Sequence, residues 1–173
     1  DDNRNYVFAG CLCTNFSITA DTGTDGGQYK FSATIQTGYV PSLNDTTARN
    51  AIGSNAYAVD TFASLSTSSG HEVLNSSVVM SSFTCTIDNP AVFIGATSNG
   101  FDVANRGSEI AVTVDTQVKL DDETKTFVNA FDTQSAFNGT DTFVIVNDDK
   151  FGIDIDDGVV TNAALSEGDI MML

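Results

Sequence analysis

Few residues in this chain have the type and spacing that catalysis needs. His71 is the only histidine, and it lies in SSGHEVLN, a segment without a nucleophile-elbow pattern. We therefore expect a solvated loop histidine. Asp154 and Asp156 point to one side of an alternating segment and could act as acid and base, but a solvated strand face explains them more simply. The sequence predicts a protein that is not an enzyme.

The sequence gives equally little support for a metal site or a cofactor site. Cys11 and Cys13 are two residues apart and point the same way on a strand, so at most one of them could pair with Cys85. Three thiols and one histidine make a poor zinc set, and we expect small buried strand residues. The segment DIDDG lacks the spacing of a calcium loop, and no phosphate-binding glycine loop is present. We expect no metal and no cofactor.

Composition predicts a folded acidic protein. The 173 residues carry a formal charge of −16, yet 41% are hydrophobic and 12 are Phe. That apolar content can offset the entropy of ordering, so residues 1–173 are read as a single domain. A surface this negative repels phosphate, which excludes ordinary nucleic-acid binding and disfavours an anionic membrane. Since 19 of the 23 carboxylates are Asp, with much Thr, Ser, Asn and Gly, the composition favours strands and turns over helices.

Alternation of apolar and polar residues is the dominant pattern along the chain, and it predicts about eight antiparallel strands. In the first segment the even positions, Phe8 to Ile18, form the apolar row. In KFSATIQT the apolar row is Phe31, Ala33 and Ile35. Glycines between these two segments predict a hairpin, and residues 91–108 are read as irregular. The strands are expected at 8–18, 30–37, 57–65, 78–87, 109–120, 142–146, 151–158 and 159–165.

Three stretches depart from this alternation. Residues 38–56 show neither period, and we expect a long loop whose apolar side chains need a partner: Tyr39, Val40, Leu43 and Ile52. Residues 66–77 are read as a polar link. Near 122–132, an aspartate cap followed by apolar residues three and four apart predicts one α-helix, which would pack through Phe127 and Phe131.

Several of these runs resemble the tail tube proteins, or major tail proteins, of long-tailed bacteriophages. They are FAGCLCTNFSIT before a Gly-rich turn, VVMSSFTCTIDNP, and EIAVTVDTQVKLDDET before a helix. The likeness extends from about Tyr6 to Leu173. It implies a β-sandwich or barrel flanked by one α-helix, assembled as hexameric rings that stack into a tube in the virion tail. The type VI secretion tube shares this architecture. The start, DDNRNY, has neither an initiator Met nor a positive n-region, so we expect a chain that is processed or part of a longer one, and the end, GDIMML, stops in mid-pattern and favours the second. Family members also usually start nearer a Met and continue further.

The resemblance also implies partners. They are other copies of the chain and other tail proteins, namely the tape measure, the tail terminator and the distal tail protein. The loop at 38–56 occupies the place of the loop that reaches the next ring. Viral DNA would pass through the channel during ejection without being bound.

A channel that conducts DNA should offer neither cations nor aromatic platforms, because phosphate contacts and base stacking hold nucleic acid. Only 7 Lys and Arg and no Trp fit that requirement. The polar strand faces give the channel-lining candidates Ser32, Thr34, Gln36, Ser82, Thr84 and Thr86, for which an ordinary solvated sheet face is the equal alternative. The alternative function is an acidic β-sandwich binding module, such as a virion decoration domain or a surface adhesin.

Overall fold

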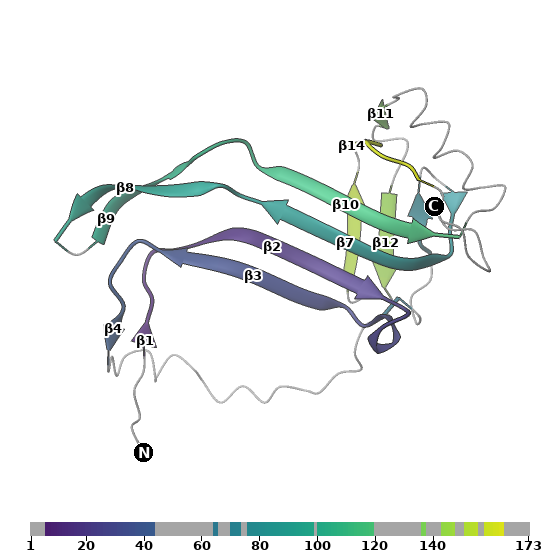
Figure 1. The fold of residues 1–173 in the computed structure, drawn as a ribbon, viewed down its shortest axis with the longest axis horizontal. Coiled ribbons are helices and arrows are strands. Elements are labelled where there is room, and N and C mark those ends of the chain that lie inside the picture. The colour runs from purple at the N-terminus through teal and green to yellow at the C-terminus, as the bar shows by residue number, and fades with distance from the viewer. Residues whose placement is uncertain are drawn as a thin grey trace, which may run out of the picture. The chain divides into compact units, whose positions relative to one another are not determined.

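A computed structural model describes residues 6–43, 64–65, 70–73, 76–98, 100–119, 136–137, 143–147, 151–155 and 158–164 (Figure 1). These residues are mainly β, and no α-helix occurs among them. No helix in this part of the chain is long and apolar enough to cross a membrane. The β-rich fold class predicted from the sequence is confirmed. The predicted helix near 122–132, with Phe127 and Phe131, lies outside the described residues.

The longest strands form an antiparallel sheet of four strands with the order β10-β7-β2-β3. It is called the central sheet below. Its strands are β10 (Ala111–Val118), β7 (Met80–Asp88), β2 (Cys11–Asp21) and β3 (Lys30–Thr37). Each of these strands follows one of the alternating segments of the sequence, because a period of two matches the pleat of a strand. The bounds of β3 coincide with the predicted strand at 30–37.

The turn between β2 and β3 contains a short 3-10 element, Asp25–Gly27. Gly26 and Gly27 have φ values of 65° and 74°, a left-handed conformation that glycine adopts without steric cost. The Asp21 carboxylate accepts a hydrogen bond of 2.7 Å from the Gly23 amide, which steadies the first half of the turn. Since β2 and β3 are neighbours in the sheet, the predicted hairpin is confirmed.

A second hairpin replaces the irregular stretch expected at 91–108. Strands β8 (Ala91–Thr97) and β9 (Gly100–Arg106) pair antiparallel from Ala91↔Arg106 to Thr97↔Gly100. The hairpin follows β7 and precedes β10 (Figure 1). The prediction was wrong because apolar residues occur on consecutive positions of β8, which hides the alternation, and because Gly95 reads as a loop residue.

The remaining strands form smaller sheets. One has the order β13-β12-β5-β6, and two more are the pairs β1-β4 and β11-β14. Their bounds are β1 (Tyr6–Val7), β4 (Ser42–Leu43), β5 (Glu72–Val73), β6 (Ser76–Ser77), β11 (Ala136–Phe137), β12 (Phe143–Asn147), β13 (Phe151–Ile155) and β14 (Gly158–Val159).

Several predicted boundaries change. The expected polar link contains β5 and β6, and the last predicted strand is reduced to β14, with residues 160–164 outside any strand. Ser42 and Leu43, expected in the long loop, pair with β1. Of the predicted strand at 57–65 only Ser64 and Leu65 are described, and Ser64 bridges Gln28.

The chain divides into two compact units whose boundaries fall inside the four central strands. Unit 1 comprises residues 1–17, 31–61 and 86–113, and unit 2 comprises residues 18–30, 62–85 and 114–173. Among the described residues, every buried apolar side chain belongs to unit 2: Ile18, Ala20, Leu65, Val78, Met80, Phe83, Cys85 and Val118. The single-domain prediction stays a prediction.

Candidate functional site

A polar hollow of about 220 Å³ lies in unit 2 against strands of the central sheet. Its walls come from β2, the turn after it, β3 and β7: Thr19, Ala20, Asp21, Thr24, Gln28, Lys30, Ser82, Phe83 and Thr84. Two predicted channel-lining residues, Ser82 and Thr84, are among them. The hollow thus brings Lys30 of β3 together with Ser82 and Thr84 of β7.

Strand alternation extends these polar rows along β3 and β7. Ser32, Thr34 and Gln36 follow Lys30 on β3 and are exposed. Ser82, Thr84 and Thr86 are half-buried on β7. By alternation, Ser32, Thr34 and Gln36 share one side of β3, and Ser82, Thr84 and Thr86 share one side of β7. In the strand order, β2 lies between β3 and β7.

Sequence reasoning missed the polar row of β2. The odd-numbered residues Asn15, Ser17 and Thr19 lie on it, in line with Asp21 of the hollow. The Asn15 amide donates a hydrogen bond of 3.3 Å to the Asp88 carboxylate at the end of β7. The odd positions of the first alternating segment, which read only as small or polar, could have indicated this row.

The register between β7 and the edge strand β10 shows which residues of β10 share a face with Ser82 and Thr84. The Lys119 amide donates to the Val79 carbonyl at 2.9 Å, and the Ser81 hydroxyl donates to the Gln117 backbone carbonyl at 3.2 Å. Odd positions of β7 and β10 therefore lie opposite each other. The apolar row of β10 consequently shares a face with Ser82 and Thr84. Of that row, which comprises Val112, Val114 and Val118, Val118 is buried while Val112 is 57% exposed, so burial is not uniform along β10.

The predicted ring-stacking residues lie in different surroundings. The Tyr39 ring packs against Gly10, and the Thr37 hydroxyl donates to the Ala9 carbonyl at 2.6 Å, which holds the chain after β3 beside the chain before β2. Tyr39 remains 38% exposed and Val40 is 79% exposed. Leu43 lies in β4. Ile52 lies outside the described residues.

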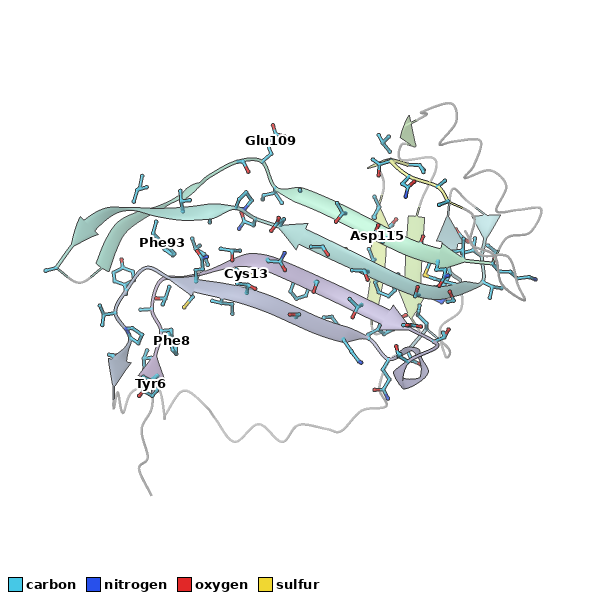
Figure 2. All side chains as sticks on the ribbon, in the orientation of Figure 1. Tyr6, Phe8, Cys13, Phe93, Glu109 and Asp115 are labelled. Atoms are coloured by element: carbon cyan, nitrogen blue, oxygen red, sulfur yellow. The ribbon has the colours of Figure 1, made fainter. Side chains whose placement is uncertain are left out.

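Unit 1 exposes further large apolar side chains. Tyr6 and Phe8, at the start of the described chain, are 61% and 57% exposed (Figure 2). On β3, Phe31 and Ile35 are 59% and 62% exposed, although the alternation predicts that they face a core. The rings of Phe16 and Phe31 are 6.2 Å apart, so this apolar row continues onto β2.

The edges of the central sheet are a separate feature. Among the described strands, β3 and β10 each have one neighbour in the sheet. Neither strand contains Pro, and charged residues in them are limited to Lys30 and Asp115. Natural sheets usually protect such edges with charges, prolines or bulges, because an unprotected edge pairs with other chains. These edges are therefore suited to association.

His71 is buried, with 7% of its surface exposed, so the expectation of a solvated loop histidine is wrong. Neither ring nitrogen makes a hydrogen bond. Burial lowers the pKa of His71, and the nearby Leu65 backbone opposes this shift to a smaller extent without forming a bond of good geometry. The imidazole is suited to remain neutral in the core of unit 2, where it has no visible catalytic partner among the described groups.

The three cysteines do not share one environment. Cys85 is buried, as predicted, and burial raises the pKa of its thiol. Cys11 and Cys13 are exposed on β2, which corrects the expectation that all three are buried (Figure 2). All three thiols are free. In the part of the chain that the structure describes, no group of three or more His, Cys, Asp and Glu residues could hold a metal ion.

The described residues thus offer a polar hollow in unit 2, two strands with one neighbour each in the central sheet, and exposed apolar side chains that belong mostly to unit 1. Comparisons with protein-family models, with curated proteins and with solved structures find no match to this chain.

Proposed function

We propose that this protein is a structural virion protein, the tail tube subunit of a long-tailed bacteriophage. Copies would form hexameric rings that stack around a channel for viral DNA. One structural observation carries the proposal. The four-stranded sheet ends on two strands, β3 and β10, that run antiparallel to each other and have one neighbour each among the described strands.

These two edges are complementary in direction. In a sheet of four alternating strands, the first and last run opposite ways, so β3 of one copy can extend the sheet by pairing antiparallel with β10 of a rotated copy. Such head-to-tail contacts close into a ring when the rotation divides a full turn. A closed sheet has no edges left, which removes the hazard of uncontrolled pairing. The resemblance in sequence supplies the expected number of six copies.

The apolar row on β3 supports the same arrangement. Phe31 and Ile35 are more than half exposed in the single chain. Covering an Ile side chain contributes about 1.5–3 kcal/mol, which helps to overcome repulsion between subunits of charge −16. Salt screens that repulsion over a Debye length of about 8 Å at physiological ionic strength. Assembly should therefore be favoured by salt.

The polar face of β3, β2 and β7 is the part that we assign to the channel. Its row on β3 is uncharged beyond Lys30, and Lys30 shares the polar hollow with Asp21. DNA moving along such a wall would find few cations and no Trp. We further propose that the central sheet and the β13-β12-β5-β6 sheet are layers of a sandwich. The tape measure, tail terminator and distal tail proteins would then be partners in the tail.

Electron microscopy of the purified chain at low and high salt tests the proposal. We expect rings or tubes at high salt. Ile35→Asp should abolish them, because it places a charge on the apolar row at the β3 edge, and should weaken association by about tenfold or more. Val79→Asp is the matched control in unit 2, since Val79 is 63% exposed against 62% for Ile35.

A wild-type chain that stays monomeric at high salt would contradict the tube and favour the acidic binding module instead. If the Ile35→Asp and Val79→Asp variants assembled equally well, the apolar row of β3 would not belong to the interface.

A further inference from the structure

The β8–β9 hairpin is the feature that the assembly argument leaves unexplained. It forms a two-stranded sheet that pairs with no other described strand. Isolated two-stranded hairpins are at best marginally stable in water, so an additional contact should stabilise this one. Its face carries Val92 and Ile94, which are 47% and 48% exposed and two residues apart on the same side of β8.

The base of the hairpin is fixed, whereas its flank is open. The side chain of Asn89 donates to the Cys13 carbonyl at 3.0 Å, and the Asn89 amide donates to the Thr14 carbonyl at 2.9 Å. The Phe93 ring lies so close to Gly38 that a Cβ there would be 2.6 Å from it. This anchoring holds the hairpin in a defined direction and leaves the side with Val92 and Ile94 available.

The charge of the hairpin indicates which kind of partner binds the side that carries Val92 and Ile94. Residues 91–106 contain one acid, Asp102, and one base, Arg106, in a chain whose formal charge is −16. A cationic partner would be drawn to the acidic surface elsewhere, and a nucleic acid would be repelled by the protein as a whole. A second copy of this chain, itself strongly acidic, meets the least repulsion at a neutral apolar segment. A second copy is therefore the occupant that fits.

Connectivity gives the direction of the contact. The hairpin continues β7 and leads back into β10 (Figure 1). Strands in a closed barrel are inclined by about 35–45° to its axis, so an extension of two strands leaves the barrel at its rim rather than at its side. We propose that the β8–β9 hairpin binds a copy of the chain in the adjacent ring through Val92 and Ile94, an inference that rests on the proposed ring.

The test compares two double variants of the full chain by sedimentation velocity and electron microscopy at high salt. The double variant Val92→Asp with Ile94→Asp should form rings that do not stack, and the protein concentration needed for stacking should rise by about a hundredfold. The control, Val79→Asp with Val159→Asp, adds the same charge at exposed valines of unit 2 and should stack like the wild type.

A variant without added charge distinguishes loss of the stacking contact from misfolding of the hairpin. Val92→Thr with Ile94→Thr keeps β-branched residues in the strand and should also weaken stacking while rings persist. Stacking of this variant at wild-type concentration would overturn the inference and leave the ring intact. Loss of rings in either hairpin variant would also overturn it, by assigning the hairpin to the ring itself. A wild-type chain that forms no rings would overturn both the inference and the proposed function.

Discussion

The two compact units of this protein differ in what stabilises them. In unit 2 the described strands bury Phe83, Met80 and Val118 to 5% exposure or less. Unit 1 contains no buried apolar side chain among the described residues, although it contains parts of the same four strands. Eleven of the 13 large apolar side chains that are exposed in the described chain belong to unit 1. Unit 2 therefore has a core of its own, while unit 1 has apolar surface that needs a cover.

Charge is divided in the same way. Unit 1 has seven acids and three bases, a formal charge of −4, whereas unit 2 carries −12. Acidic side chains on a protein with a core cost little and keep it soluble, but they oppose contact between identical copies. The weakly charged, apolar unit is thus the one suited to contacts, and the strongly acidic unit is suited to remain in water. This difference is the physical basis for proposing a self-assembling structural protein.

The sharpest test of this comparison exchanges one phenylalanine in each unit for alanine. Phe83 is 2% exposed and its ring lies 5.7 Å from that of Tyr29, so Phe83→Ala should cost about 3–5 kcal/mol of unfolding free energy. Phe31 is 59% exposed and contacts Phe16, so Phe31→Ala should cost about 1 kcal/mol or less. Urea unfolding of the monomer at low salt measures both values.

The Phe31→Ala variant should nevertheless assemble poorly at high salt, because its ring lies on the apolar row assigned to the interface. Similar unfolding costs for the two substitutions would contradict the division into a unit with a core and a unit without one.

A smaller effect should appear in the pH dependence of stability. His71 is buried in unit 2 and its pKa is lowered by burial from the ordinary value of 6.5. The unfolded chain therefore binds a proton at a higher pH than the folded chain. Stability from this group is complete above about pH 6.5 and declines as the pH falls toward the folded pKa, by about 1.4 kcal/mol for each pH unit that separates the two pKa values.

Measuring the unfolding free energy between about pH 7 and pH 5 isolates this effect, since most carboxylates titrate below that range. His71→Gln keeps a polar side chain of similar size that does not titrate there, and should flatten the slope. A slope that persists in this variant would assign the pH dependence to other groups.

The sequence was informative where one face of a strand is apolar and the other polar. The segment KFSATIQT satisfies that condition, and its bounds match β3. The β8–β9 hairpin was missed because Val92, Phe93 and Ile94 are consecutive apolar residues, and Gly95, which has a φ of 77°, interrupts the strand. A hairpin that pairs with no other described strand lacks the sheet context that imposes a period of two.

The candidate site shows a different limit. Local pattern predicted the polar rows of β3 and β7, and their assignment to a channel stays a prediction. It could not show that Phe31 and Ile35 are exposed, because alternation identifies an apolar face without indicating what covers it. It also misplaced His71, whose polar neighbours Ser69 and Glu72 suggested a solvated loop. Burial depends on tertiary contacts that a local sequence window does not contain.

The smallest expected effect concerns the thiols, which also divide between the units. Cys11 and Cys13 of unit 1 are exposed, while Cys85 of unit 2 is buried with a raised pKa and so has little thiolate at neutral pH. Titration of the native monomer with a chromogenic disulfide should show two fast thiols and one that reacts only slowly. Unfolding in urea should make all three thiols react at the same rate.

The Phe83→Ala substitution should accelerate the reaction of the Cys85 thiol alone. Both side chains lie in the core of unit 2, and loosening that core opens a path to the thiol. If that substitution changed Cys11 and Cys13 as well, the two units would lose stability together, and the part of the sheet in unit 1 would depend on the core of unit 2.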